Sequence, residues 1–318
     1  MKEQKLNIFC HIPREGWIVD RLGKEYLKHS EHNVSHNVID RNTDVIWLYA
    51  GWCWNHINES ILKNYKVVCT EHHIVKSKFE KEKKQSFLQR DKFVDHYLTY
   101  TLETKNFISK YTKKPITIIP HWVNENLWDE FDDTESIREE LNLPNDKFIV
   151  SSFQRDTEGF DLRTPKLEKG PDIFIDKINH ISKIKPLHVL LGGWRRQYII
   201  NHLDKMKIDY TYIELPDIKT INKMYCASDL YLMSSREEGG PQAIFESSFL
   251  KIPILATKAG QSQNLLHKES LYDFDEVITE NKIQKAFDCI KNNRKNVELY
   301  LIRNHMKNYD NFFREVVK

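Results

Sequence analysis

The chain has 318 residues, of which 40% are hydrophobic and 12% aromatic. This composition excludes a disordered or fibrous protein, and the length leaves room for about two domains. The formal net charge of +2 and the pI of about 8.1 give no argument for nucleic-acid binding.

The cysteines and the apolar runs indicate where the protein resides. The five cysteines are scattered, without the paired spacing of metal ligands, at Cys10, Cys53, Cys69, Cys226 and Cys289. We expect them to be reduced thiols in the core of a cytoplasmic protein. The apolar run after MKEQK is too short for a signal peptide, and no run reaches the length of a membrane span. We therefore expect a soluble protein.

Apolar runs of strand length alternate with amphipathic segments along the whole chain, which is typical of parallel sheets covered on both faces. In the first half we predict strands at 6–12, 44–50, 65–71, 96–101 and 116–120, with helices beginning near 17, 55, 84 and 103. In the second half we predict strands at 148–153, 187–192, 210–215, 230–233 and 252–257, with helices that include 171–184 and 195–207. The predicted fold class is α/β, with two Rossmann-like parallel-sheet domains.

A stretch rich in acidic and amide residues separates the two halves. Residues 122–146 contain DEFDD, end in LPND and have no strand pattern, so we expect a linker at 126–145 with a short helix at 134–141. The predicted domains are therefore 1–125 and 146–295. The last 23 residues carry apolar side chains at helical spacing and predict a terminal helix.

Ligands of open parallel sheets bind beyond the carboxyl ends of the strands, so residues at these points are candidates for a site. The first strand is followed by a loop with the single glycine Gly16, which either forms a plain turn or contacts a ligand. No G-x-G-x-x-G is present, which argues against a nicotinamide or flavin enzyme.

After the second predicted strand come Trp52 and Trp54, beside amide and imidazole groups. Flat aromatic faces suit sugar rings, so both are predicted acceptor contacts; alternatively, Trp54 packs beneath the next helix.

Residues 76–92 contain seven basic and three acidic side chains. Such a run is usually the solvated face of a helix. The alternative is a patch that contacts an anionic membrane surface or a phosphorylated acceptor.

The most informative stretch is 230–260, with the sequence LYLMSSREEGGPQAIFESSFLKIPILATKAG. A strand is followed by Gly239, Gly240 and a proline that fits the first helical position. A helix that ends near Lys251 comes next. The backbone N–H groups of Gln242 and Ala243 would then face an anion at the helix N-terminus. Within this apolar helix Glu246 needs hydrogen-bond donors.

Glu238 and Glu246 bracket this helix start, with seven residues between them. Together with the strands and the Gly-Gly-Pro turn, this arrangement resembles the glutamate signature of retaining GT-B glycosyltransferases of family 4, also called group 1. The resemblance implies that Glu246 binds the ribose of a nucleotide-sugar and that Glu238 faces the donor sugar. The backbone implied to bind the diphosphate belongs to Gly239, Gly240, Gln242 and Ala243.

The same resemblance assigns two cations to the donor diphosphate. Arg155 matches the first, and Lys169, which precedes a glycine, matches the second. Fixed cations are needed there because negative charge develops on the leaving diphosphate. Gln154 stands where the family has glycine, and the spacing to Lys169 is longer, so Lys166 is an alternative to Lys169.

Further positions follow from the resemblance alone. His72, or His73 beside it, would line the acceptor side of a cleft between the domains, and Gly16 would contact the donor phosphates or the acceptor. Leu215 would flank the nucleoside, and Gly260 would pack near the donor site, if it is not a plain turn. The terminal helix, 300–318, would cross back to the first domain.

The implied function is the retaining transfer of a sugar from a nucleotide-sugar, with a UDP-sugar or GDP-sugar expected, to a glycan, lipid-linked or other hydroxyl acceptor. We expect no cofactor and no metal, since Arg155 and a lysine supply positive charge at the diphosphate. Contact with the inner face of the membrane would be peripheral.

Two alternatives to this function stay open. An epimerase on a GT-B scaffold would need acidic residues at first-domain strand ends, where we find Glu15 and Glu71. A catalytically silent glycan-binding protein would need no donor residues.

Overall fold

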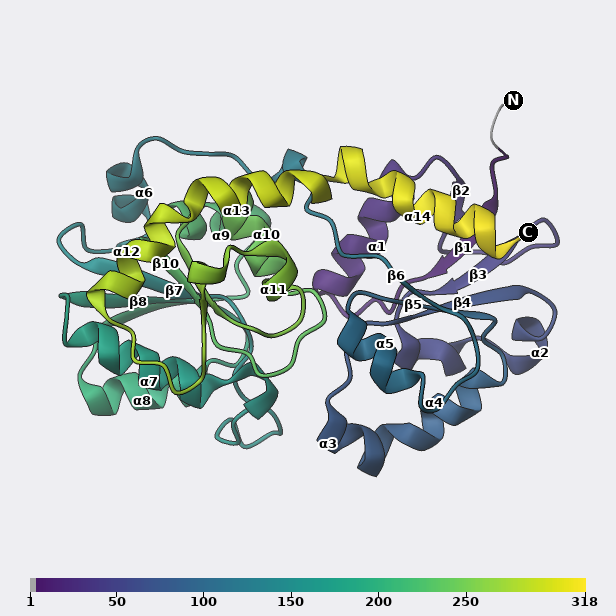
Figure 1. Ribbon diagram of the computed structural model, residues 1–318, viewed down its shortest axis with the longest axis horizontal. Helices are drawn as coiled ribbons and strands as arrows, with labels where there is room; N and C mark the ends of the chain where they lie inside the picture. Colours follow the sequence, from purple (N-terminus) through teal and green to yellow (C-terminus); the bar gives the residue numbers. More distant parts are fainter. Residues whose placement is uncertain (1–3) are drawn as a thin grey trace. The chain divides into compact units, whose positions relative to one another are not determined.

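The computed structural model describes residues 4–318. The chain forms two compact units (Figure 1). The first contains the chain up to Asn124 together with Tyr300–Lys318, and the second contains Glu125–Leu299. Each unit has a six-stranded sheet in which every pairing is parallel, which confirms the predicted α/β class.

The sheet of the first unit has the strand order β2-β1-β3-β4-β5-β6. Its strands are β1 (Asn7–His11), β2 (Asn33–Ser35), β3 (Val45–Leu48), β4 (Lys66–Glu71), β5 (His96–Thr99) and β6 (Ile116–Ile118). The sequence did not predict β2, because only one of its three side chains is apolar. It is an edge strand that pairs with β1 through the backbone.

Helices cover both faces of this sheet. One face packs on α1 (Ile18–His29) and α14 (Ile302–Val316), whose buried residues share a core cluster with β1 and β3. Tyr26 of α1 donates a hydrogen bond to Asp310 of α14, with 3.0 Å between Oη and Oδ1. The other face packs on shorter segments. They are η1 (Gly51–His56), α2 (Glu59–Leu62), η2 (Phe79–Lys83), α4 (Lys84–Asp91) and α5 (Leu102–Ile108). The short helix α3 (Lys76–Lys78) precedes η2 and has no buried residue.

The sheet of the second unit has the order β12-β11-β10-β7-β8-β9. Its strands are β7 (Phe148–Ser152), β8 (Leu187–Gly193), β9 (Tyr210–Glu214), β10 (Leu230–Met233), β11 (Ile254–Thr257) and β12 (Leu271–Tyr272). The two-residue strand β12 is too short to produce a sequence pattern and was not predicted. Because β10 and β7 are neighbours, the loops that follow them lie side by side.

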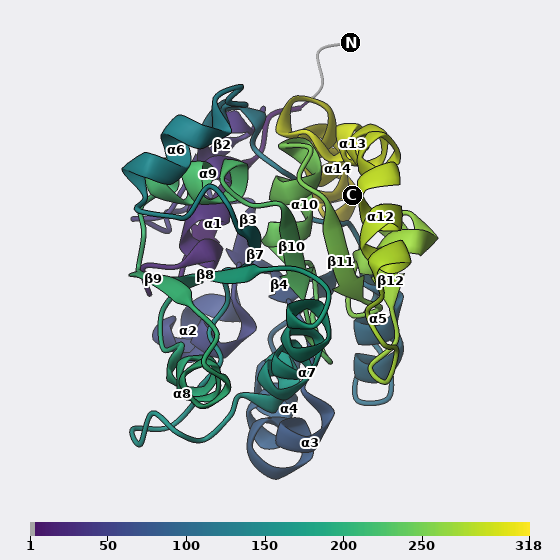
Figure 2. The ribbon, with the colours of Figure 1, turned by 90° about the vertical axis from the view of Figure 1, so that its left-hand side faces the viewer.

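The long helices of the second unit lie on the two faces of its sheet. Figure 2 shows α7 (Pro171–Ser182) and α8 (Gln197–Met206) on one face, and α9 (Ile218–Cys226) and α10 (Gln242–Phe249) on the other. The remaining helical segments are η3 (Glu125–Leu127), α6 (Thr134–Glu140), η4 (Leu167–Lys169), α11 (Ser262–Leu265), η5 (Lys268–Ser270), α12 (Glu280–Asp288), α13 (Ile290–Val297) and η6 (Glu298–Tyr300).

The segment 126–145, expected as a linker, is part of the second unit. Arg138 of α6 donates to the carbonyl oxygen of Ala227 at 3.0 Å and pairs with Asp229 at 2.8 Å. Asp229 also accepts the backbone N–H of Ile149, at the start of β7. The acidic composition of the segment gave no sign of this packing, because a single buried arginine makes the contacts.

Candidate functional site

An ion pair connects two of the predicted site residues in the second unit. The Nζ atom of Lys169 lies 2.6 Å from Oε1 of Glu238, and these side chains are 19% and 8% exposed. Lys169 ends η4, in the turn before α7, and Glu238 follows β10. The hydroxyl of Ser235 also donates to Glu238, at 2.8 Å. The tertiary structure therefore brings the ammonium and the carboxylate together at the carboxyl edge of the sheet.

Gln154, at the exit of β7, joins this group through its side-chain amide. Its Nε2 donates to the carbonyl oxygen of Lys169 at 2.9 Å. Its Oε1 lies 3.1 Å from Oγ of Ser235. A hydroxyl has a single proton, so Ser235 donates to Gln154 or to Glu238 at any one time. Gln154 thus links the loops after β7 and β10 to the Lys169 turn.

Two glycines allow these loops to approach closely. Gly170 has φ +60, and a Cβ atom there would lie 1.9 Å from the carbonyl oxygen of Ser234. Gly260 has φ +59, and its Cβ would lie 2.4 Å from the carbonyl oxygen of Gly239, which also accepts the N–H of Gln261 at 3.0 Å. Gly260 therefore packs against the loop that carries Glu238.

The helix α10 begins differently from the prediction. Pro241 is its N-cap, with ψ 112, rather than its first helical residue. The helix ends at Phe249, and Lys251 adopts φ 60, a left-handed conformation that cannot continue it. Gln242 and Ala243 lie in the first turn, where backbone N–H groups have no acceptor within the helix. Gly240 lies directly before the N-cap.

Glu246 has the hydrogen-bond donor that its position requires. The side chain is 5% exposed and accepts a hydrogen bond from the Tyr225 hydroxyl of α9, at 2.8 Å. The sequence identified the buried carboxylate, and the fold supplies a donor from a helix that precedes it in the chain.

Arg155 and Lys166 lie in the long loop after β7. Arg155 donates from Nε to the carbonyl oxygen of Thr157 at 2.6 Å, and its guanidinium lies 5.1 Å from the ring centre of Trp194. Burial, followed by repulsion from Arg195, lowers the pKa of Arg155. Lys166 lies 3.7 Å from Glu168. Lys169 rather than Lys166 therefore pairs with Glu238.

A compact hairpin accounts for the long spacing between Arg155 and Lys169. Thr157 forms an antiparallel bridge with Pro165, and the Asp161 carboxylate accepts the backbone N–H groups of Arg163 and Thr164. Phe160 at the tip is 99% exposed. Sequence reasoning missed this hairpin, although its Gly159 and Asp161 are typical turn residues.

Two predicted residues lie outside these contacts. Leu215 follows β9, is 69% exposed and has φ 46. Gly16, in the first unit, has φ +80 and donates its backbone N–H to Asp20 at 2.6 Å. Asp20 also accepts the N–H of Arg14, so this carboxylate fixes the loop as a turn.

His72 is a buried residue of the first unit, at the end of β4. Its Nε2 lies 2.9 Å from the carbonyl oxygen of Tyr49, so this nitrogen carries the proton. Burial lowers its pKa to about 4. The ring of Trp52 lies 5.5 Å from it between centres and is 47% exposed, and its Nε1 donates to Glu15 at 2.9 Å. Trp52 is therefore accessible to a ligand, and His72 lies beside it in a neutral form at neutral pH.

The prediction that Trp54 contacts an acceptor needs correction. Its side chain is 7% exposed, donates to Ser86 of α4 at 3.1 Å and stacks on Phe93 with 5.9 Å between ring centres. The 3-10 turn η1 directs alternate tryptophans to opposite environments, so Trp54 belongs to the core beneath α4.

Comparison with known proteins identifies relatives of this chain. Residues 162–291 match the family model described as "Glycosyl transferases group 1". A glycogen synthase from Thermosipho africanus is 24% identical over 197 residues, which cover 56% of this chain and 38% of that protein. Among solved structures, Anabaena HepE in complex with UDP and glucose matches with a TM-score of 0.79 at 14% identity, over 98% of this chain and all of the other. Sucrose-phosphate synthase from Thermosynechococcus elongatus matches with a TM-score of 0.69 at 18% identity, over 96% of this chain and 80% of the other.

Residues 162–291 are therefore similar to the group 1 glycosyltransferases, and the chain has the GT-B fold. The group 1 match includes the Lys169–Glu238 pair and Glu246, whereas Arg155 and the first unit lie outside it. The chain spans well under half the length of the glycogen synthase that it matches.

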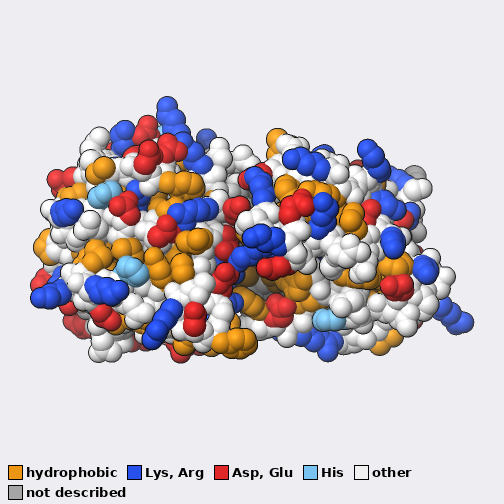
Figure 3. Space-filling view, turned by 90° about the horizontal axis from the view of Figure 1, so that it is seen from below, with side chains coloured by type: hydrophobic (Ala, Val, Ile, Leu, Met, Phe, Trp, Pro, Cys, Tyr) orange, Lys and Arg blue, Asp and Glu red, His pale blue; other side chains and the backbone are white. Residues whose placement is uncertain are grey.

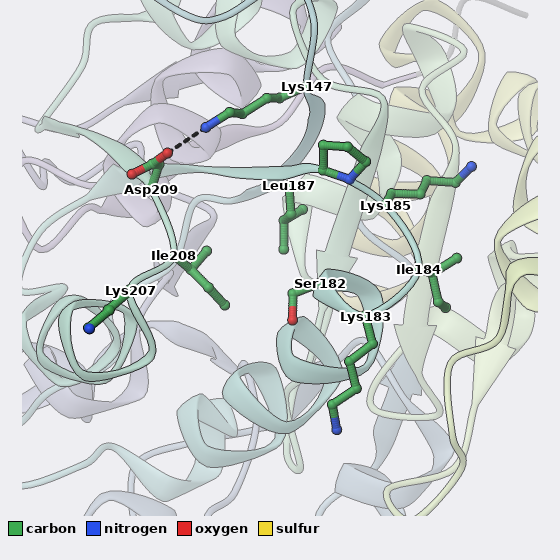
Figure 4. A pocket seen from close by; sticks show the side chains of 10 residues that line it. Lys147, Ser182, Lys183, Ile184, Lys185, Leu187, Lys207, Ile208 and Asp209 are labelled. Carbon is green, nitrogen blue, oxygen red and sulfur yellow. Dashed lines mark hydrogen bonds and ion pairs between the residues drawn. The ribbon is translucent and has the colours of Figure 1, made fainter.

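Figure 4 shows a surface pocket of the second unit that contains none of these residues. It has a volume of about 490 Å³ and is lined by residues before β7, β8 and β9, at the amino edge of the second sheet. Lys183 and Lys207 on its rim directly follow α7 and α8, where a cation compensates the carboxyl end of a helix. The pocket is therefore separate from the candidate site.

Charged side chains are mixed over the surface. Figure 3 shows basic and acidic side chains interspersed on one face. In the segment 76–92, Lys76 pairs with Glu103 at 2.7 Å and Lys84 with Glu80 at 2.9 Å, whereas Phe79 and Phe87 are buried. Across residues 4–318, no helix is long and apolar enough to cross a membrane. The same residues contain no group of three or more His, Cys, Asp or Glu that could bind a metal ion.

Proposed function

We propose that this protein is a retaining glycosyltransferase that moves a sugar from a nucleotide-sugar to a hydroxyl group of a glycan, lipid-linked or other acceptor. The observation that carries the proposal is the Lys169–Glu238 ion pair at the carboxyl edge of the sheet, with the buried Glu246 in the helix that follows. Both lie in the region that matches group 1 glycosyltransferases. HepE, solved with UDP and glucose, supports a UDP-sugar as donor, with a GDP-sugar as the alternative.

In this mechanism the second unit binds the donor. Glu246 accepts hydrogen bonds from the ribose hydroxyls, and the first turn of α10 faces the diphosphate, because the positive end of the helix dipole favours an anion. Lys169 and Arg155 stabilise the charge that develops as the bond from the anomeric carbon to the diphosphate oxygen breaks. The acceptor hydroxyl oxygen bonds to the same face of that carbon, and its proton passes to the departing diphosphate.

We also propose that the reaction needs no divalent metal. A guanidinium and an ammonium at the diphosphate supply positive charge of the kind that a metal ion supplies in other phosphoryl and glycosyl transfers. The five cysteines are buried free thiols, which supports action in the reducing cytoplasm. The ion pairs of Lys76 and Lys84 favour a solvated helix face over a membrane-binding patch.

The epimerase alternative is weakened by the partners of two glutamates in the first unit. Glu71 forms a buried ion pair with Arg90, and Glu15 accepts the indole N–H of Trp52. Both carboxylates are therefore engaged in contacts within the fold. A silent glycan-binding protein would have no need for the combination of Lys169, Glu238 and Glu246.

A thermal-shift screen with UDP, GDP, ADP and CMP, each with and without a sugar, tests the class and the base together. A nucleotide at a hundred times its Kd adds about 2.7 kcal/mol to the free energy of unfolding. Proton NMR of the product of the best donor then reports its anomeric configuration. Binding of none of these nucleotides would contradict the proposal, and inversion would contradict the retaining mechanism alone.

A further inference from the structure

Two oppositely charged side chains of the second unit are almost completely removed from water. Arg196 is 0% exposed and Asp156 is 1% exposed, with 3.1 Å between Nε and Oδ2. Arg196 also donates to the carbonyl oxygen of Ser152, to its hydroxyl at 3.2 Å and to the carbonyl oxygen of Gly192 at 2.7 Å. One guanidinium therefore links the carboxyl ends of β7 and β8 to the loop after β7.

Each member of this pair directly follows a partly exposed arginine in the sequence. Arg155 precedes Asp156, and Arg195 precedes Arg196. The two surface guanidiniums lie 5.1 Å and 4.3 Å from the ring centre of Trp194. The backbone carbonyl of Arg195 accepts the N–H of Asp156 at 3.2 Å, so the two loops are also joined through the backbone.

Two features of the surface arginines are unfavourable, although Arg195 donates to the carbonyl oxygen of Gly159 and Arg155 to that of Thr157. Arg195 has φ 58, a left-handed conformation that is strained for a side chain with a Cβ. The two guanidiniums also carry like charges beside one ring, and burial, followed by repulsion from Arg195, lowers the pKa of Arg155. Backbone strain and like charges persist where the surrounding contacts determine the geometry, and they concentrate at binding sites for an opposite charge. The buried ion pair provides such contacts.

We propose that the Asp156–Arg196 pair positions Arg155 and Arg195 beside Trp194 as a joint binding site for the donor diphosphate. The inference rests on the proposed function and adds Arg195 as a second guanidinium to the residues that contact the anion. Asp156 and Arg196 are positioning residues, because both are buried and act through their neighbours in sequence. A diphosphate would relieve the repulsion between the two guanidiniums.

Calorimetric titration of UDP and GDP into the full chain tests this inference, followed by titration of the tighter nucleotide and its nucleoside into variants. Asp156→Asn and Arg196→Lys should lower the affinity for the nucleoside diphosphate about tenfold or more, as loss of a supporting residue commonly does. Affinity for the nucleoside, which has no phosphate, should change less than about twofold. Arg195→Ala, which alters no buried charge, should show the same selective loss.

The same unit offers a matched control in the Arg138–Asp229 pair. It also combines an ion pair with hydrogen bonds to the backbone, but it lies at the amino edge of the sheet, at Ile149. Arg138→Lys and Asp229→Asn should lower the Tm and leave diphosphate affinity within about twofold. The inference is overturned if the Asp156 and Arg196 variants lose nucleoside and nucleotide affinity equally, or if Arg195→Ala binds like the unchanged protein. Failure of the unchanged protein to bind UDP or GDP would instead overturn the proposed function, and this inference with it.

Discussion

The ammonium of Lys169 lies 2.6 Å from the carboxylate of Glu238, although 69 positions separate the two residues in the sequence. In the proposed mechanism, binding of the donor replaces part of this ion pair, because Lys169 then contacts the diphosphate and Glu238 contacts the sugar. The ion pair keeps both side chains in place before the donor binds. Glu238→Gln should therefore leave the fold intact, weaken this contact and lower turnover.

Glu246→Gln should weaken nucleotide binding by about tenfold to a hundredfold, since a hydrogen bond to a charged group contributes about 1.5 to 3 kcal/mol. The amide retains the shape and can still accept from Tyr225. Calorimetry with the free nucleoside diphosphate measures the effect, and Tyr225→Phe, which removes only the supporting hydroxyl, provides the comparison. An unchanged affinity in Glu246→Gln would remove the carboxylate from the ribose site.

Arg155→Ala should lower kcat by on the order of a hundredfold while changing nucleotide affinity less, because the guanidinium acts on charge that develops during bond cleavage. Steady-state kinetics with the donor found in the screen measure both parameters. Arg163→Ala, an exposed arginine on the same hairpin, is the matched control. A loss of less than about threefold in Arg155→Ala, below roughly 1 kcal/mol, would show that this side chain does not stabilise the leaving group.

The two tryptophans of η1 should respond in opposite ways to truncation. Trp54→Ala should cost about 3 to 5 kcal/mol in the free energy of unfolding, because it empties a core position beneath α4. Trp52→Ala should cost less than about 1 kcal/mol and raise the acceptor concentration required for transfer. Urea unfolding and acceptor titration separate the effects. Normal acceptor dependence in Trp52→Ala would remove the last tryptophan from the proposed acceptor site.

Gly170 and Gly16 both have positive φ but differ in their surroundings, so alanine should affect them unequally. Gly16→Ala should cost about 1 to 2 kcal/mol, which is the penalty of the left-handed conformation, because nothing lies within 4 Å of the added Cβ. Gly170→Ala should cost more than about 4 kcal/mol, since the added carbon would overlap the carbonyl oxygen of Ser234. Comparable Tm values for the two variants would contradict the packing of this turn.

The stability of the first unit should fall as the pH is lowered from about 6.5 to about 4. Burial lowers the pKa of His72 to about 4 and that of His121 well below its ordinary value. The unfolded chain therefore binds protons in this window that the native protein does not, and stability present above pH 6.5 is lost as the pH falls. For His72 the effect is up to about 3 kcal/mol.

Urea unfolding at a series of pH values measures this loss. His72→Gln retains a donor for the carbonyl of Tyr49 and should flatten the pH dependence. An equal slope in the variant and the unchanged protein would show that His72 is not the group that resists protonation.

The sequence by itself determined the alternation of strands and helices, the α/β class and the unusual position of Glu246, because hydrophobic periodicity and a lone carboxylate in an apolar helix are local features. It also placed Glu238 at the exit of a strand. It could not predict β2 or β12, since a strand of two residues, or of three with a single apolar side chain, leaves no hydrophobic pattern in the sequence.

Only the tertiary structure decided which distant side chains meet. It selected Lys169 over Lys166 as the partner of Glu238 and supplied Tyr225 for Glu246. It also placed Trp54 in the core and Trp52 at the surface, which composition could not distinguish. The physical reason is that hydrogen bonds and ion pairs depend on separations of a few ångströms, and these are set by strand order and loop packing rather than by distance along the chain.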